Sequence, residues 1–317
     1  MEEGGMTMAG DMRVAVIGQA SFGKSVLNAL ADRGYTVVAA LCPPDREGRP
    51  SDPLKKAALE LGVPVHQFPR LRDQTAIDAF RAVEPDLCAM AFVTDIVPEA
   101  ILVAPSRGTI QYHPSLLPRH RGPSSINWPI IQGETRTGLT IFWPDKGLDT
   151  GPILIQKEVE IGPEDTVGSL YFDKLFPLGV EAMVEAVNMV GDGTAPRIAQ
   201  DESQATYEGW CKAEDAVIDW TRPISETHNL VRGSDPSPGA GTTYEGQPVR
   251  LYRASRRDGE SGRTPGEVTE VTADAFGVAV DGGTLLFRRV QPRGSGKVSA
   301  PEWAEAVGLR PGARIGT

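Results

Sequence analysis

The sequence predicts an α/β protein in which a Rossmann-like, doubly wound and mostly parallel sheet is followed by a small C-terminal β-barrel domain, OB-like in kind. From residue 13 to residue 190, short apolar runs alternate with helical patterns, as in a doubly wound sheet. After residue 191, short β-like runs are separated by Gly, Pro and Asp, as in a small all-β domain. The length of 317 residues allows two domains, since single cores rarely grow beyond about 250–300 residues.

The first part of the chain alternates strands with helices. The predicted strands are residues 14–17, 35–41, 63–67 and 87–92, and the predicted helices between them are residues 22–31, 51–61 and 75–83. The second helix has Ser51 as its expected N-cap and Pro53 early in its first turn. The run Leu87–Phe92 is apolar without alternation, which is typical of a central strand covered on both faces.

The pattern then becomes less regular. Strands are predicted at residues 109–112, 138–143 and 153–159, and helices at 124–132 and 166–190, the latter bent near Pro177. Between them, residues 113–122 and 144–151 have no helical or strand period, so we expect two irregular loops.

The last part of the chain is expected to be all-β, with strands at residues 249–252, 266–271, 277–280 and 284–290 and a mobile polar loop at 256–264. We therefore divide the chain into a flexible tail (1–11), a first domain (12–192), a linker (193–206) and a C-terminal barrel (207–317).

Charge and composition restrict the class of protein. The net charge of −10 argues against nucleic-acid binding as the main task, because phosphate neutralisation needs a basic face. Neither the three widely spaced cysteines nor the four histidines have metal-ligand spacing, so we expect reduced thiols and no metal. The first eleven residues lack the basic and apolar blocks of a signal peptide, so we expect them to be a flexible tail, and the sequence has no apolar run of about 20 residues. We predict a cytoplasmic protein that does not bind membranes.

One motif suggests a nucleoside triphosphatase. The segment Gly18-Gln-Ala-Ser-Phe-Gly23-Lys24-Ser25 fits the phosphate-loop pattern, with Lys24 on a terminal phosphate and Ser25 on magnesium. Asp95, after a predicted strand, could be the second metal-binding carboxylate. The alternative interpretation is that the two glycines only permit a tight turn and close helix packing, and we favour it because a stronger candidate site lies elsewhere in the sequence.

A second constellation lies in the irregular loops. Gln111 and His113 end one predicted strand, and Asp149 lies in the loop Gly147-Leu-Asp-Thr-Gly151 after a later one. In an open α/β sheet, the ligand crevice lies beyond the carboxyl ends of the strands. If the two strands are neighbours, an amide, an imidazole and a carboxylate converge on one crevice.

Such a trio can transfer an acyl group. Acyl transfer to an amine or to water needs a base, a donor to the developing oxyanion and a proton for the leaving nitrogen. Asp149 can act as the base or orient His113, His113 can donate to the oxyanion or relay a proton, and Gln111 can donate its amide. No Ser or Cys nucleophile is required, so direct transfer through a tetrahedral intermediate is the simplest mechanism. Taken singly, each of the three residues is more typical of an ordinary loop or strand end.

The two loops resemble the formyltransferase family that uses 10-formyltetrahydrofolate. The shared motifs are His113-Pro-Ser-Leu-Leu-Pro-Arg-His-Arg-Gly122, Gly147-Leu-Asp-Thr-Gly151, the first strand from Val14 to Gln19, and Thr206-Tyr-Glu-Gly209 and His228-Asn further on. Within the family, the chain is most similar to the N-terminal hydrolase domain of 10-formyltetrahydrofolate dehydrogenases, and more distantly to methionyl-tRNA formyltransferases.

The resemblance implies a co-substrate and a set of site residues. The formyl donor would be 10-formyltetrahydrofolate, with His113 and Asp149 in the essential catalytic positions. The residues expected to bind folate are Ser115, Leu116, Leu117 and Pro118, in a loop that shapes the crevice, and Asp95, Ile96 and Val97, whose backbone reads the pterin ring. Gln111 departs from the family, because the transferases carry Asn there and the dehydrogenases an apolar residue. Its role at the oxyanion is therefore open.

Three formyl acceptors remain possible: a small amine, water and tRNA. Methionyl-tRNA formyltransferases carry a basic insertion in the first domain, whereas the corresponding residues 43–50 are few and of mixed charge. Together with the net charge of −10, this favours a small amine or water over tRNA. A folate-binding module that has lost catalysis is a further alternative, which the presence of His113 and Asp149 disfavours.

Overall fold

The computed structural model describes residues 12–316, which form two compact units built from separate stretches of the chain. Unit 1 contains the residues up to 122, residues 138–159 and residues 174–207. Unit 2 contains residues 123–137, residues 160–173 and the residues from 208 onward. The tail expected at residues 1–11 lies outside the described residues, and the domain boundaries placed at 192 and 207 stay a prediction.

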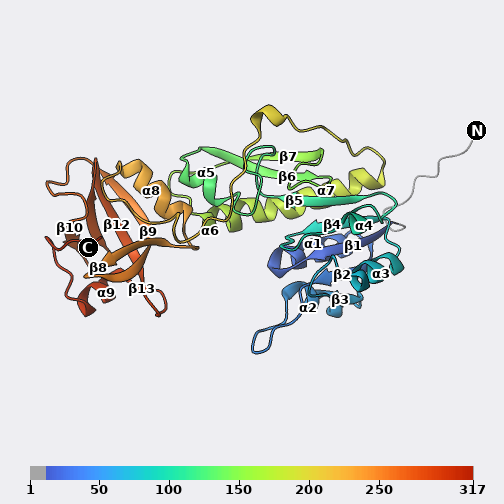
Figure 1. Ribbon diagram of the computed structural model, residues 1–317, viewed down its shortest axis with the longest axis horizontal. Helices are drawn as coiled ribbons and strands as arrows, with labels where there is room; N and C mark the ends of the chain where they lie inside the picture. The colour runs from blue at the N-terminus through green and yellow to red at the C-terminus, as the bar shows by residue number, and fades with distance from the viewer. Residues whose placement is uncertain (1–11, 317) are drawn as a thin grey trace, which may run out of the picture. The chain divides into compact units, whose positions relative to one another are not determined.

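A seven-stranded, mostly parallel sheet organises the first half of the chain (Figure 1). Its strands are β1 (Arg13–Gly18), β2 (Thr36–Cys42), β3 (Val65–Gln67), β4 (Leu87–Ala91), β5 (Thr109–His113), β6 (Arg136–Phe142) and β7 (Ile153–Glu160). Their order is β3-β2-β1-β4-β5-β6-β7. Strands β1 to β5 pair in parallel and β6 is antiparallel to β5, which confirms the predicted doubly wound fold.

Helices cover both faces of this sheet. They are α1 (Ala20–Asp32), α2 (Pro53–Glu60), α3 (Gln74–Ala82), α4 (Glu99–Leu102) and α7 (Phe176–Gly191). On one face, Ile77 and Phe80 of α3 pack against apolar side chains of the sheet, among them Ile17. On the other face, the ring of Phe22 on α1 lies 4.3 Å from that of Tyr112 on β5. Most of β5 is therefore buried between these helices.

Two details of these helices differ from the prediction. The N-cap of α2 is Asp52 rather than Ser51, and its side chain accepts the Leu54 amide. The single helix expected at residues 166–190 is interrupted: α6 (Val167–Ser169) and a π-helical turn (Leu170–Leu175) precede α7. Pro177 in the first turn of α7 has no amide hydrogen to donate, so the regular helical pattern restarts there.

Unit 2 contains a six-stranded antiparallel sheet that curls around one apolar core (Figure 1). Its strands are β8 (Ala240–Tyr244), β9 (Gln247–Asp258), β10 (Val268–Val271), β11 (Phe276–Val280), β12 (Gly283–Pro292) and β13 (Val298–Ser299). Phe276 and Phe287 pack at the centre of this core with their rings 5.7 Å apart. The prediction that the C-terminal domain is all-β at its core is confirmed.

Three helices complete unit 2, and two of them were not predicted. They are α5 (Asn127–Ile131), α8 (Ile224–Gly233) and α9 (Ala300–Ala306). The helix predicted at 124–132 is shorter, because the Ser124 carbonyl accepts the Asn127 amide in a tight turn. The loop predicted at 256–264 is also shorter, since Arg256 and Arg257 continue β9 by pairing with β12. Pairing with β12 therefore keeps these polar residues in a strand.

Within residues 12–316, no helix is long and apolar enough to cross a membrane.

Candidate active site

The end of β5 places Gln111 and His113 on one face of the sheet. Side chains alternate along a strand, so these two residues point to the face opposite Tyr112, which packs on α1. His113 is 6% exposed, while Gln111 is half-buried. In the described part of the chain, no hydrogen bond joins Gln111 to His113 or to Asp149. The predicted convergence of all three side chains is therefore not seen for Gln111 among the described residues, and its catalytic role stays a prediction.

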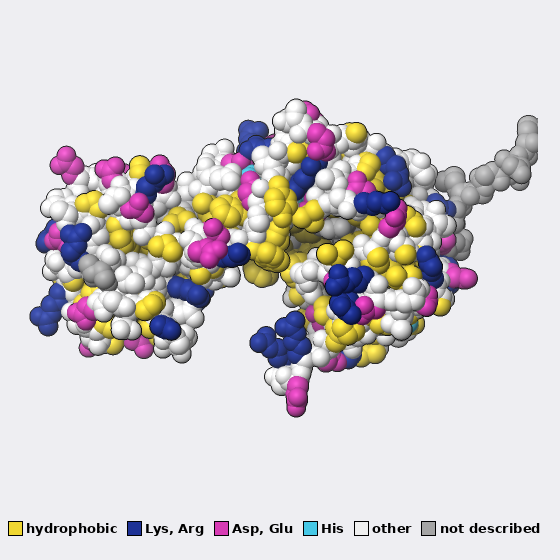
Figure 2. Space-filling model, in the orientation of Figure 1, with side chains coloured by type: hydrophobic (Ala, Val, Ile, Leu, Met, Phe, Trp, Pro, Cys, Tyr) yellow, Lys and Arg dark blue, Asp and Glu magenta, His cyan; other side chains and the backbone are white. Residues whose placement is uncertain are grey.

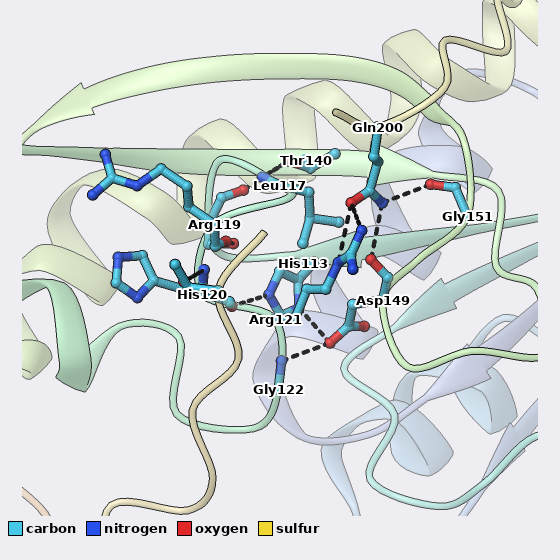
Figure 3. A network of polar contacts seen from close by, with 12 residues as sticks. His113, Leu117, Arg119, His120, Arg121, Gly122, Thr140, Asp149, Gly151 and Gln200 are labelled. Atoms are coloured by element: carbon cyan, nitrogen blue, oxygen red, sulfur yellow. Dashed lines mark hydrogen bonds and ion pairs between the residues drawn. The ribbon is translucent and has the colours of Figure 1, made fainter. Parts of the chain in front are cut away.

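His113 lies between a backbone carbonyl and a carboxylate (Figure 3). Its Nε2 atom is 2.9 Å from the carbonyl oxygen of His120, and its Nδ1 atom is 3.6 Å from Oδ2 of Asp149. A carbonyl oxygen can only accept, so the first contact requires a proton on Nε2. The Nδ1 edge therefore remains to exchange a proton with Asp149 or with a bound substrate.

Asp149 sits in a tight loop that fixes its carboxylate. The carboxylate is 7% exposed, and its Oδ2 atom accepts the Gly122 amide at 2.9 Å. A Cβ atom on Gly151 would lie 1.7 Å from the Trp143 carbonyl oxygen, so only glycine fits at that position. Asp149 itself adopts a left-handed backbone with φ of 57°, a conformation that costs a non-glycine residue about 1–3 kcal/mol. The motif is thus a strained turn that presents one carboxylate.

The two loops meet by a route different from the expected one. We expected parallel strands to end at the same edge, but β6 is antiparallel to β5 and ends beside Gln111, which pairs with Phe142. The loops meet nonetheless, because the Gly122 amide bonds the Asp149 carboxylate. The predicted convergence of His113 and Asp149 is therefore present in the structure.

A network that the sequence analysis missed surrounds the Asp149 loop (Figure 3). Gln200 donates its Nε2 to the carbonyl oxygens of Asp149 at 2.9 Å and of Gly151 at 2.7 Å. The Oε1 atom of Gln200 accepts from Arg121, at 3.2 Å from Nε and 2.7 Å from Nη2. Gln200 lies in the segment interpreted as a linker, and nothing in its local sequence distinguishes it from a solvated Gln.

Arg121 is anchored in turn by Glu202. The guanidinium, 7% exposed, bonds both carboxylate oxygens of Glu202 at 2.7 and 2.9 Å. This hydrogen-bonded pair raises the pKa of Arg121 and lowers the pKa of Glu202. The contact keeps a permanent positive charge beside the Asp149 loop.

The loop predicted to shape the folate crevice is held by hydrogen bonds. Ser115 is fully buried, and its hydroxyl donates to the Arg119 carbonyl at 2.7 Å. The Leu117 amide donates to the Thr140 hydroxyl at 3.1 Å, and the Leu117–Pro118 peptide is cis. The buried hydroxyl and amide serve the loop itself, so ligand contacts from residues 115–118 stay a prediction.

The segment predicted to read the pterin ring follows β4. Asp95 accepts the Leu71 amide at 2.7 Å and the Ile96 amide at 2.9 Å, so its carboxylate holds the loop in place. Ile96 is 73% exposed, whereas Val97 packs partly against the core. The Ile96 amide is thus already bonded, and ligand binding at residues 95–97 stays a prediction.

The phosphate-loop interpretation of residues 18–25 does not fit the structure. Helix α1 already begins at Ala20, so Gly23 and Lys24 are helical and form no loop around a phosphate. The Ala20 amide at the start of α1 is bonded by both carboxylate oxygens of Asp52 at 3.0 Å, which places the chain's own anion where a phosphate would bind. Gly18 is needed for close packing, because a Cβ atom there would lie 2.2 Å from the Ala91 carbonyl oxygen.

No group of three or more His, Cys, Asp or Glu side chains in residues 12–316 is arranged to hold a metal ion. The buried thiol of Cys88 has a raised pKa because of desolvation, and burial raises the pKa of Cys211 to about 11. Both thiols are therefore unsuited to act as nucleophiles.

The fold is a doubly wound α/β sheet followed by a small β domain, and sequence comparison identifies the family. The model of the formyl transferase family matches residues 12–187, and that of the formyl transferase C-terminal domain matches residues 211–308. The chain belongs to the formyl transferase family. The predicted resemblance and the prediction of an enzyme of this family are confirmed.

Several relatives are similar along most of the chain. Mouse mitochondrial 10-formyltetrahydrofolate dehydrogenase is 41% identical over 310 residues, which are 93% of this chain and 33% of the relative. The chain thus spans about a third of the length of these dehydrogenases. The methionyl-tRNA formyltransferase of Trichlorobacter lovleyi is 39% identical over 91% of this chain and 92% of its own length.

Solved structures share the fold. HypX from Aquifex aeolicus in complex with tetrahydrofolic acid has a TM-score of 0.71 at 20% identity, over 92% of this chain and 47% of that one. An N-formyltransferase from Helicobacter canadensis, in complex with folinic acid and dTDP-3-aminofucose, has a TM-score of 0.69 at 17% identity over 90% of this chain and 100% of that one. These likenesses concern the fold alone.

Proposed function

We propose that this chain takes the formyl group from 10-formyltetrahydrofolate and passes it directly to a small acceptor, either a small amine or water. The observation that carries the proposal is the buried His113–Asp149 pair, with its Nδ1 to Oδ2 distance of 3.6 Å, in a member of the formyl transferase family. Folate use is supported by the dehydrogenase relative, whose name includes 10-formyltetrahydrofolate. We place the enzyme in the cytoplasm.

The geometry suggests how the pair acts. The acceptor's N–H or O–H group attacks the formyl carbon, and its proton passes to the Asp149 carboxylate or to the Nδ1 edge of His113. Within the described residues, Oδ2 of Asp149 is held by Gly122, whereas Oδ1 has no hydrogen-bond partner and can face the acceptor. The bond between the formyl carbon and the folate nitrogen then breaks, and the same proton returns to that nitrogen.

The oxyanion of the tetrahedral intermediate needs a donor. A protonated His113 offers its Nδ1–H, and Gln111 lies on the same face of β5, two residues earlier. We propose Gln111 as the second donor, reaching further than an Asn would by one methylene. The folate would lie along residues 95–97 and 115–118, as the family resemblance implies.

A small acceptor is supported by the surface of the first unit. The loop of residues 43–50, between β2 and α2, is exposed and carries both signs of charge, as Figure 2 shows by dark blue and magenta side chains on the same loop. One of its acids, Asp45, pairs with Lys55. A phosphate backbone would meet no uniformly basic surface there.

Transfer to methionyl-tRNA is the second candidate. It is favoured by one observation: the methionyl-tRNA formyltransferase relative is matched over 92% of its own length, whereas the dehydrogenase is matched over 33%.

One experiment separates these possibilities. Purified protein is incubated with 10-formyltetrahydrofolate alone, with a panel of small amines including amino sugars, and with methionyl-tRNA, and tetrahydrofolate release is followed. Release without an acceptor identifies a hydrolase, and dependence on an amine identifies a small-molecule transferase. Release only with methionyl-tRNA establishes the second candidate, and no release in any arm contradicts the proposed function.

A further inference from the structure

A short segment, residues 200–206, contacts both catalytic loops. At one end, Gln200 donates to the backbone carbonyl of Asp149 at 2.9 Å. At the other end, the Thr206 hydroxyl accepts the His120 amide at 2.8 Å. The segment therefore joins the loop that carries the carboxylate to the loop whose carbonyl holds His113.

The contacts of Gln200 define which way its amide points. The Arg121 guanidinium has only donors, so it must face the oxygen of the Gln200 amide. The carbonyls of Asp149 and Gly151 only accept, so they must face the nitrogen of that amide. Glu202 in turn holds the guanidinium of Arg121 from the other side. Every polar atom of the Gln200 side chain is thus used, and the opposite amide orientation would lose all of these bonds.

The two residues that the segment holds both have unfavourable backbones. Asp149 has φ of 57° and His120 has φ of 54°, in the left-handed region that favours glycine. Such residues keep this conformation only where the surroundings enforce it. If the Asp149 backbone relaxed, its Oδ2 atom would move away from the Gly122 amide and from the imidazole of His113.

We propose that Gln200 is a positioning residue for Asp149: its two hydrogen bonds hold the strained loop so that the carboxylate faces His113 before substrate binds. The proposal rests on the proposed function, since it assigns Gln200 to the same formyl-transfer site. Gln200 touches no reacting atom and acts through the Asp149 backbone. A misplacement of about 1 Å at such a site can lower the rate of reaction up to about a hundredfold.

The variant Gln200→Glu tests the proposal, because a carboxylate still accepts from Arg121 but cannot donate to the two carbonyls. We expect kcat for tetrahydrofolate release to fall at least about tenfold while KM for 10-formyltetrahydrofolate stays within about twofold. Gln204→Glu is the matched control, since Gln204 is exposed in the same segment and its side chain bonds, among the described residues, only Asp201. The control should retain kcat within about twofold.

The same substitution in the Asp149→Asn background separates positioning from a general loss of structure. If Gln200 acts through Asp149, Gln200→Glu should not lower the residual rate further. An equal further fall in that background, or an unchanged kcat in the wild-type background, overturns the proposal. Gln200→Ala serves the same comparison if the Glu variant does not fold. Failure of the wild-type protein to release tetrahydrofolate contradicts the proposed function instead, so the two failures are distinguishable.

Discussion

The Asp149 carboxylate accepts a hydrogen bond from the Gly122 amide, with 2.9 Å between Oδ2 and the nitrogen. This bond joins the last residue of the Pro- and Arg-rich loop to the middle of the Gly-Leu-Asp-Thr-Gly loop. It also holds the carboxylate 3.6 Å from His113, so the two motifs form one site.

The first prediction concerns this carboxylate. Asp149→Ala should abolish formyl release, and Asp149→Asn should lower kcat by about 10²–10⁴-fold, because the amide cannot take the acceptor's proton. Asn also tolerates the left-handed backbone at φ of 57°, so Asp149→Asn should fold like the wild type. Steady-state kinetics with 10-formyltetrahydrofolate measure the effect, and a melting curve checks the fold. Normal turnover in either variant would contradict the assignment of Asp149.

A second prediction concerns the N-terminus of α1, where the Ala20 amide already bonds the Asp52 carboxylate. Lys24 is exposed on helix α1 and lies in no phosphate-binding loop, so Lys24→Ala should change formyl release by no more than a few-fold. ATP hydrolysis by the parent protein, together with complete loss of activity in this variant, would restore the phosphate-loop interpretation.

A third prediction concerns the carboxylate of Asp52. Asp52 accepts the amides of Ala20 and of Leu54, the latter at 2.8 Å, and so caps the starts of α1 and α2. We expect Asp52→Ala to lower the free energy of unfolding by roughly 1–3 kcal/mol, since each lost cap costs about 1 kcal/mol. Urea unfolding measures this value. A loss below about 0.5 kcal/mol would mean that the two caps contribute little.

Much of the fold could be predicted from the sequence, because buried parallel strands give apolar runs that need no knowledge of partners. The helix α8 escaped prediction because its pattern is polar, with buried His228 and Arg232 replacing apolar residues on its inner face. Arg232 is satisfied by the carbonyls of Gly162 and Asp165 at 3.1 Å, contacts that depend on tertiary structure.

The site could be predicted only in part, for a related reason. His113 and Asp149 lie in motifs with distinctive Gly and Pro spacing, whereas Gln200 acts through its distance to two carbonyls some fifty residues away. The Asp52 carboxylate shows the same limit, since it fills the end of α1 from 32 residues further along the chain. Sequence patterns record local periodicity, and these contacts are non-local.

A fourth prediction tests the close packing at the end of β1. A Cβ atom on Gly18 would lie 2.2 Å from the Ala91 carbonyl oxygen, which is backbone and cannot turn aside. Gly18→Ala should therefore destabilise the protein by about 1–3 kcal/mol. Gly296→Ala is the matched control, because no atom of residues 12–316 lies within 4 Å of a Cβ atom there. Equal melting temperatures for the two variants would contradict the packing role of Gly18.

The last prediction concerns pH and the buried His228. This side chain is 2% exposed, and its Nε2 atom lies 3.4 Å from the Ala254 carbonyl and 3.8 Å from the Glu164 carboxylate. Desolvation lowers the pKa of His228 below its ordinary value of 6.5, the neighbouring Arg232 and Arg256 add to this, and Glu164 acts in the opposite sense.

Between the lowered pKa of His228 and about 6.5, the unfolded chain binds more protons than the folded protein. The free energy of unfolding of the wild type should therefore decrease as the pH falls below about 6.5. In His228→Gln it should depend less on pH, since Gln does not titrate and can still donate to the Ala254 carbonyl. Urea unfolding at pH 7.5 and 5.5 measures the difference. His66→Gln is the control, because His66 is only half-buried on β3. The His228 variant should lose less free energy of unfolding between pH 7.5 and 5.5 than the wild type and the control do. An equal loss in all three would contradict the role of the buried His228.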